Sequence, residues 1–225
     1  MVAIDIVSDT VCPWCFIGKR RLEAAMRQRP DYEYQIGWRP FQLNPDLPRA
    51  GMERRQYLAL KFGGGDRAQQ IYSHVKAAGR QECIAFDFEA IRLQPNTFDS
   101  HRLIRWAAYA GVQDRVVEVL FRRYFTEGAD VGSRAVLLEV AAACGMQVEA
   151  VRRMFESGTD AELVREEEMV ARRMGVNGVP CFIVDRKYAV SGAQEPSVLV
   201  NVFDLAARET QARPRLQAAE GAADD

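Results

Sequence analysis

The chain has 225 residues, of which 48% are hydrophobic, and its formal net charge is -1. Such a chain can bury a sizeable core, and its nearly balanced, interspersed charges argue against a nucleic-acid groove. No hydrophobic run approaches the roughly 20 residues of a membrane-spanning helix, so we expect no membrane insertion. Residues 1–9 lack a basic segment and contain Asp5 within the apolar stretch, so we expect no signal peptide and a cytoplasmic protein.

The first 43 residues predict a β-α-β unit. Residues 3–8 are short and β-branched, which is typical of a strand. Residues 13–29 place apolar side chains on one broad helical face, with Pro13 in the first turn and Pro30 after the last. Residues 32–41 predict a second strand, joined to the first by a crossover through this helix.

The middle of the chain changes character and predicts a block of helices. Residues 44–157 contain six segments with apolar residues three or four apart, separated by Gly, Pro, Asn or Ser. The only candidate strand in this block is at residues 84–88. The block is therefore expected to be an all-helical insertion.

The last part of the chain returns to an α/β pattern. A charged helix is expected over residues 160–174, followed by strands at 179–185 and 187–192 with a tight turn at Asp185-Arg186. Pro196 opens a final helix. The order predicts an α/β domain made of residues 1–43 and 160–210, an insertion of residues 44–159, and a flexible tail at 211–225.

Two of the five cysteines, Cys12 and Cys15, lie three residues apart where the first strand meets the first helix. A structural zinc site needs four ligands, and the chain has one CxxC and only two histidines, so no metal is expected. A pair of packing cysteines is the plain alternative. The position favours redox chemistry instead, because N–H groups and the macrodipole at a helix start favour a thiolate at Cys12 by about 0.3–2 kcal/mol.

In this interpretation Cys12 and Cys15 are catalytic, since Cys15 follows one helical turn later on the same side. It would attack a mixed disulfide held on Cys12 and release the substrate. Pro13 removes one N–H and fixes the turn, and Trp14 is expected to lie exposed beside the sulfurs as a flat platform for a partner.

Five segments carry a family resemblance. They are SDTVCPWCFIGKRRLE, WRPFQLNP, KFGGG, PNTFDSHRL and GVNGVPCFIVDRKYAVSGAQ, in this order over residues 3–208. Together they resemble the DsbA-like, FrnE-type branch of the thioredoxin superfamily. The resemblance implies an α/β thioredoxin fold with an all-helical insertion domain. It also implies a cis peptide bond between Val179 and Pro180 beside the CxxC, where it would present the Val179 backbone to an extended substrate.

The same wider group contains 2-hydroxychromene-2-carboxylate isomerases and kappa-class glutathione transferases. Those proteins typically have a serine where this chain has Cys12 and lack the second cysteine, so two cysteines favour thiol–disulfide exchange. A glutathione-dependent isomerase or transferase and a chaperone-like peptide-binding module stay open as alternatives. We expect no tightly bound cofactor, glutathione as a redox partner, a protein or small thiol or disulfide as substrate, and a homodimer as a candidate assembly.

Four other residues are candidates for the site. Asp9, three residues before Cys12, could relay a proton to the pair or simply cap a loop. His101 and Asn96 could line the cleft, although packing within the helical block is the plainer role for His101. Strand alternation turns Cys181 away from the active face toward the core, and a third redox thiol is the alternative.

Overall fold

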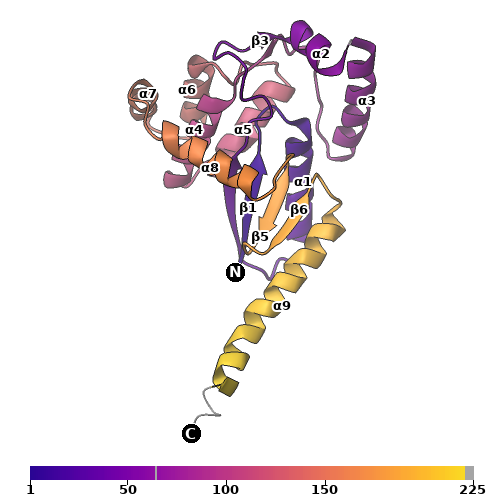
Figure 1. The fold of residues 1–225 in the computed structure, drawn as a ribbon, viewed down its shortest axis with the longest axis vertical. Helices are drawn as coiled ribbons and strands as arrows, with labels where there is room; N and C mark the ends of the chain where they lie inside the picture. The colour runs from indigo at the N-terminus through magenta and orange to yellow at the C-terminus, as the bar shows by residue number, and fades with distance from the viewer. Residues whose placement is uncertain (64, 221–225) are drawn as a thin grey trace.

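The chain forms a mixed four-stranded sheet covered by helices (Figure 1). The computed structural model describes the backbone of residues 1–63 and 65–220 and the side chains of residues 1–63 and 67–209. The strands are β1 (Val2–Ser8), β2 (Tyr34–Pro40), β5 (Cys181–Val184) and β6 (Tyr188–Ser191), in the spatial order β2-β1-β5-β6. β1 pairs with β2 in parallel and with β5 antiparallel, and β5 and β6 form an antiparallel hairpin.

The central strand and the first helix form because their apolar residues fit both sides of the sheet. β1 is internal to the sheet, and its β-branched residues pack on both faces. A parallel pair needs a crossover, and α1 (Pro13–Arg27) supplies it. The buried face of α1 includes Phe16, Ile17 and Leu22. The predicted β-α-β unit is thus confirmed.

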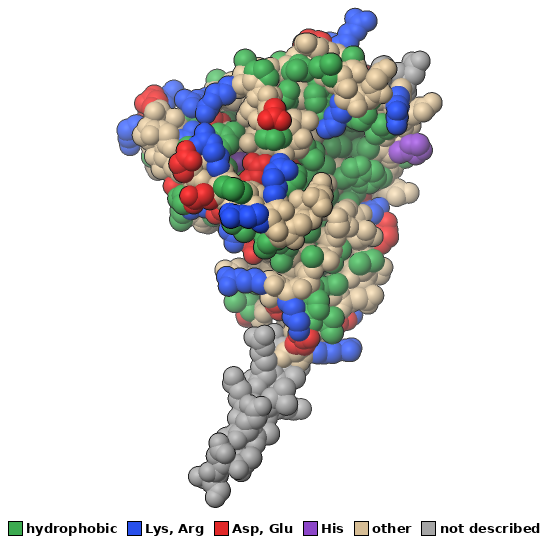
Figure 2. Space-filling model, in the orientation of Figure 1, with side chains coloured by type: hydrophobic (Ala, Val, Ile, Leu, Met, Phe, Trp, Pro, Cys, Tyr) green, Lys and Arg blue, Asp and Glu red, His purple; other side chains and the backbone are tan. Residues whose placement is uncertain are grey.

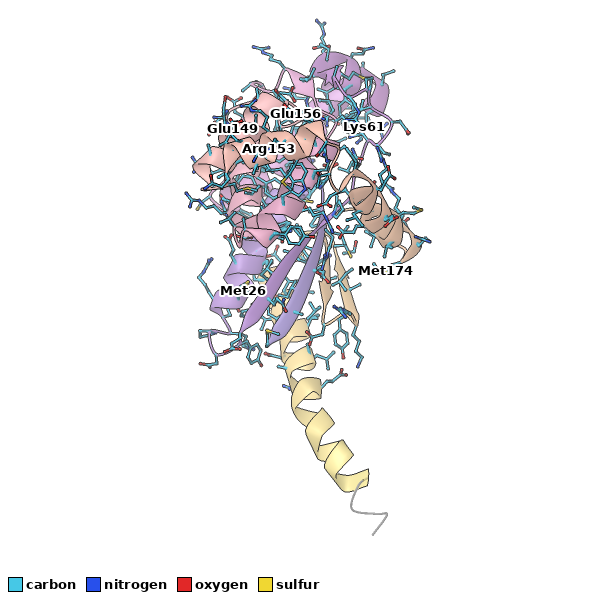
Figure 3. The ribbon with its side chains drawn as sticks, turned by 90° about the vertical axis from the view of Figure 1, so that its left-hand side faces the viewer. Met26, Lys61, Glu149, Arg153, Glu156 and Met174 are labelled. Carbon is cyan, nitrogen blue, oxygen red and sulfur yellow. The ribbon has the colours of Figure 1, made fainter. Side chains whose placement is uncertain are left out.

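Helices cover the sheet on both sides. α1 and α9 (Pro196–Glu220) pack on one face, and α8 (Ala161–Arg173) packs on the other. In Figure 3 the labelled Met26 near the end of α1 and Met174 after α8 lie on opposite sides of the strands. Successive β5 residues alternate between these faces, as Phe182 joins the core beneath α1 and Cys181 packs with the α8 residue Ala171.

The segment between β2 and α8 is mostly helical. It contains α2 (Arg54–Phe62), α3 (Gly65–Gln81), α4 (Phe98–Tyr109), α5 (Gln113–Phe125), α6 (Arg134–Ala143) and α7 (Val148–Glu156). One short antiparallel pair, β3 (Met52–Glu53) with β4 (Leu93–Gln94), was not predicted, since two residues are too few to show an alternating pattern. The candidate strand at 84–88 is wrong, because its buried rings Phe86 and Phe88 stack in the core at a centroid distance of 5.0 Å without a partner strand.

The hairpin turn follows the prediction. Asp185 and Arg186 both adopt positive φ, at 50° and 57°, and Lys187 N donates to Val184 O at 3.0 Å to close the turn. Aspartate tolerates this conformation better than most residues. The α/β fold with a helical insertion is therefore confirmed.

The predicted domain boundaries, at residues 43/44, 159/160 and 210/211, stay predictions. The backbone of α9 runs to Glu220, inside the segment 211–225 expected to be a flexible tail, and the side chains there lie outside the described residues. Within the described part of the chain, no helix combines the length and the apolar character needed to cross a membrane.

Candidate active site

The cysteine pair lies at the start of α1, four residues beyond the end of the central strand. Cys12 is the N-cap residue, in an extended conformation with φ -93° and ψ 112°, and Pro13 occupies the first helical turn. Two backbone bonds of 3.0 Å fix the loop, from Cys12 N to Asp9 O and from Cys15 N to Cys12 O. The loop geometry therefore places both sulfurs on one side of the helix start.

The two thiols are close to each other, and no disulfide joins them in the structure. Burial raises the pKa of the Cys15 thiol well above its usual value, and the hydrogen bond to Cys12 and the charge of Cys12 add to the rise. Hydrogen bonds from the Ser8 hydroxyl and the Asp9 backbone amide act in the opposite direction. Cys15 is therefore held as a neutral thiol beside the Cys12 sulfur.

Both cysteines are shielded, which the sequence did not indicate. Cys12 is 4% exposed and Cys15 is 1% exposed, whereas Trp14 between them is 38% exposed. Trp14 thus has the exposure that the sequence predicted. A substrate that reaches this site must meet Cys12 first, because Cys15 lies fully inside the core.

The cis-proline loop lies directly against Cys12. The Val179–Pro180 peptide bond is cis, as the resemblance implied, and Cys12 Sγ donates to Val179 O at 3.4 Å. Gly18 on α1 makes this approach possible, since a Cβ there would lie 2.9 Å from Pro180 Cγ and 3.1 Å from Phe182 Cζ. Sequence reasoning missed Gly18, because a glycine inside a helical pattern does not show which residue will pack against it.

Asp9 and His101 come together behind the loop. Asp9 is 0% exposed, and its carboxylate accepts from Leu43 N at 2.7 Å and from Val11 N at 3.5 Å. His101 Nε2 lies 3.6 Å from Asp9 Oδ1 and has no hydrogen-bond partner among the described residues. The structure therefore joins two of the predicted residues into one buried pair, and the Asp9 main chain contacts both Cys12 and Cys15.

Asn96 takes part in a different arrangement. Its side-chain amide donates to Leu47 O at 2.8 Å, and its carbonyl accepts from Phe98 N at 3.0 Å. It also lines a separate pocket of about 220 Å³ beside Arg49 and Arg134. No hydrogen bond joins Asn96 to the cysteine pair in the described part of the chain, so its contacts order the loop before α4.

Cys181 packs in a different hydrophobic cluster from Cys12 and Cys15. It belongs to a small hydrophobic cluster with Val7, Phe41, Ala171 and Val176, on the face of the sheet that α8 covers. Burial raises its pKa. The packing role expected for Cys181 therefore agrees with where the structure places it.

Tyr72 of α3 is a neighbour of the site that the sequence did not reveal. Burial raises the pKa of the Tyr72 phenol, the Arg54 cation lowers it, and the charge of Cys12 contributes a smaller rise. Tyr72 Oη accepts a hydrogen bond of 2.7 Å from Nη2 of the buried Arg54. Among described residues, no three His, Cys, Asp or Glu side chains gather as a metal site would require.

Comparisons with a family model and with solved structures place this geometry among known proteins. The model of a family described as DSBA-like thioredoxin domain matches residues 3–204. The crystal structure of a probable DsbA oxidoreductase from Streptomyces coelicolor is 30% identical, with a TM-score of 0.84, and the match covers 93% of this chain and 91% of that one.

Two more distant structures share the fold. A 2-hydroxychromene-2-carboxylate isomerase is 16% identical, with a TM-score of 0.66 over 97% of this chain and 98% of that one. The cytosolic disulfide reductase DsbM from Pseudomonas aeruginosa, solved with GSH, is 19% identical, with a TM-score of 0.59 over 94% of this chain and 99% of that one. At these identities the likeness shows the thioredoxin-type architecture alone.

Proposed function

The chain belongs to the DSBA-like thioredoxin domain family, and from this premise we propose that it is a thiol–disulfide oxidoreductase that uses Cys12 and Cys15. The observation that supports it most directly is the contact between the two thiols at a helix start, beside a cis-proline loop that accepts a hydrogen bond from Cys12. This arrangement fits a pair that forms and breaks one disulfide.

The reaction proceeds in two exchanges. The Cys12 thiolate attacks one sulfur of a substrate disulfide, so that the substrate S–S bond breaks, a mixed disulfide forms on Cys12, and one thiolate leaves and takes a proton. Cys15 then loses its proton and attacks Cys12, which releases the second thiol and leaves a Cys12–Cys15 disulfide. Two electrons pass to the substrate, and two molecules of a small thiol such as glutathione return them. The same steps in reverse oxidise a substrate dithiol.

The second exchange needs a base, because burial keeps Cys15 protonated. Asp9 is the proposed acceptor, since its backbone contacts both cysteines and its carboxylate is enclosed by the same loop. His101 Nε2 lies 3.6 Å from the Asp9 carboxylate and positions it, and His101 is the group proposed to accept the proton from Asp9. Asn96 has no part in this relay, because its hydrogen bonds hold the loop before α4.

The test uses three variants and a small neutral disulfide, bis(2-hydroxyethyl) disulfide, with glutathione as reductant. Cys12→Ser should abolish turnover, and Cys15→Ser should accumulate a mixed disulfide on Cys12 that intact-mass spectrometry detects. Cys144→Ala is the matched control, because Cys144 is buried in the insertion away from the pair. Full turnover by the Cys12 variant would refute the proposal.

The same variants separate the alternatives. A glutathione-dependent isomerase or transferase acting on a small aromatic compound would keep its activity in Cys15→Ser, because such chemistry needs no resolving thiol. A chaperone-like module would suppress aggregation of a client equally well with both cysteines replaced by serine. The presence of the second cysteine favours the oxidoreductase over both.

The compartment and assembly are also proposals. The exposed thiol of Cys83 suits the reducing cytoplasm, where lone cysteines stay reduced. A homodimer is supported by the exposed apolar side chains of α8, including Leu163, Val170 and Met174 just after it. Light scattering on a size-exclusion column tests the assembly, and a monomeric mass at all loadings contradicts it.

A further inference from the structure

A buried arginine on α1 holds the loop of residues 192–195, which joins β6 to α9. Arg21 is 8% exposed and lies one helical turn after Gly18, so both positions share one face of α1. Arg21 Nη1 donates to Ala193 O at 2.7 Å and lies 2.8 Å from Glu195 Oε1. Figure 1 shows this loop beside α1, where β6 passes into α9. Arg21 therefore connects the helix of the cysteine pair to the loop.

The other side of the Arg21 guanidinium contacts the helical insertion. Arg21 Nε donates to Glu82 Oε1 at 2.8 Å, and Glu82 follows directly after α3. The Glu82 side chain is 18% exposed and that of Glu195 is 66% exposed, so the ion pair with Glu82 is the less screened of the two. Arg21 thus joins three parts of the molecule, which are α1, the end of α3 and the loop before α9.

The same loop holds the backbone of Pro180. Gly192 N donates to Pro180 O at 2.8 Å. Gly192 has φ 80°, a conformation that glycine adopts without strain, and Ala193 is the next residue. Ala193 also approaches α1, since its Cβ lies 3.6 Å from where a Cβ on Gly18 would be. The loop therefore contacts α1 through Ala193 and Pro180 through Gly192, and it fixes the spacing between them.

These contacts form a closed path that returns to the reactive sulfur. Pro180 follows Val179, whose carbonyl accepts a hydrogen bond from Cys12 Sγ at 3.4 Å. Cys12 begins α1, and Arg21 lies further along the same helix. Every step of the path is a hydrogen bond or a covalent link, so a shift of Ala193 is transmitted to Val179 O. Loss of the Arg21 contacts therefore allows Val179 O to move away from Cys12 Sγ.

We propose that Arg21 is a positioning residue for the redox reaction, which sets the Pro180 loop against Cys12 by holding Ala193 O. The inference rests on the proposed function and adds a residue that acts through the backbone rather than on sulfur. The hydrogen bond from Cys12 Sγ to Val179 O requires a thiol, because a disulfide sulfur has no proton to donate. Arg21 therefore stabilises the dithiol form of the pair relative to its disulfide.

The experiment measures the ratio of dithiol to disulfide in a glutathione buffer of fixed composition. Two glutathione thiols reduce the Cys12–Cys15 disulfide and leave as one glutathione disulfide, and acid quenching, alkylation and intact-mass spectrometry read the ratio. Arg21→Met removes every donor and keeps a long side chain. Loss of a weak S–H···O bond should lower the ratio about twofold to fivefold. A side chain that only stabilised the fold would affect both redox forms equally and leave the ratio unchanged.

Arg20→Met is the matched control. It removes a neighbouring cation of α1, whose side-chain hydrogen bonds among described residues go to Glu23 and Glu118 instead of the loop. Arg21→Lys keeps the charge but replaces the planar fork by a single ammonium, so it should lower the ratio by less. The lysine variant also provides the measurement if Arg21→Met does not fold.

The rate of mixed-disulfide formation gives a second readout. With bis(2-hydroxyethyl) disulfide it should fall about tenfold per folded molecule in Arg21→Met, because a displaced positioning group is costly in catalysis. This substrate is neutral, and Figure 2 shows acidic and basic side chains interspersed over the visible face, so the lost charge does not change its attraction to the protein.

The outcomes separate the two proposals. If the unaltered protein does not turn over this disulfide and forms no disulfide between Cys12 and Cys15, the proposed function itself fails. If it does both, but the Arg21 variants keep the ratio and the rate of the Arg20→Met control, only the positioning role is overturned.

Discussion

Replacing Gly18 with alanine tests whether the contact between α1 and the cis-proline loop sets the geometry of the redox site. The new Cβ would lie 2.9 Å from Pro180 Cγ and 3.1 Å from Phe182 Cζ. Carbon atoms in contact settle near 3.5–4.0 Å, so one partner must move by about 0.6 Å. Phe182 is 0% exposed, whereas Gly178 and Val179 before Pro180 are only partly buried, so we expect the Pro180 loop to move.

The magnitude follows from two opposing effects. Overpacking a core costs about 1–3 kcal/mol, and alanine in a helix interior recovers about 1 kcal/mol relative to glycine. The free energy of unfolding should therefore fall by about 0–2 kcal/mol, which lowers Tm by up to roughly 8 °C in a chain of this size. Turnover should fall by more than this loss of stability explains. Moving Pro180 shifts Val179 O, which lies 3.4 Å from Cys12 Sγ in the structure, away from the reactive sulfur.

The assay combines urea unfolding with turnover of bis(2-hydroxyethyl) disulfide, measured where the variant is fully folded. We expect turnover to fall about tenfold or more, since displacement of a positioning group by a fraction of an ångström is costly in catalysis. Gly178→Ala is the control, because a Cβ there meets nothing within 4 Å although Gly178 lies in the same loop. Normal turnover in the Gly18 variant, or an equal loss in the control, would refute the reasoning.

Two further predictions concern protons. Asp9→Asn should slow the release step by Cys15 more than the formation of the mixed disulfide on Cys12, which acid-quenched mass spectrometry resolves; equal slowing of both steps contradicts a relay. Burial raises the pKa of Cys15 and Cys181, so above about pH 8.5 the unfolded chain loses protons that the folded one keeps. The free energy of unfolding of the reduced protein should therefore fall as pH rises from 8 to about 10. Urea midpoints measure it, and a midpoint that rises over this range contradicts the assignment.

The sequence predicted most of the fold because its signals are local. The apolar period and Pro13 mark α1, the short apolar run after Pro180 marks β5, and the Asp185-Arg186 turn marks the hairpin. Each depends on neighbouring residues alone. The pair β3–β4 escaped prediction because it is two residues long and joins segments about 40 residues apart, where no periodicity links them.

The site was predicted in part for the same reason. The spacing of Cys12 and Cys15 identifies them in the sequence. The pairing of Asp9 with His101 could not be predicted, because the fold brings together two residues 92 positions apart. The burial of Arg54 could not be predicted either, since in the sequence Arg54 stands in a run of charged residues that looks like a solvated helix face. Its burial arises from packing against Tyr72 and Tyr124, which no local pattern encodes.

The structure also changes the account of why the two cysteines differ. The sequence argument credited the helix start with making Cys12 the attacking group, an effect of at most about 2 kcal/mol. The contacts add a second cause on the other thiol, because burial and the neighbouring sulfur hold Cys15 in its protonated form. A protonated thiol is a poor nucleophile, so Cys15 stays inactive until Cys12 carries a substrate and Cys15 loses its proton. Forming the mixed disulfide consumes the Cys12 thiol, so the hydrogen bond that helps to raise the pKa of Cys15 is lost at the moment when Cys15 must attack.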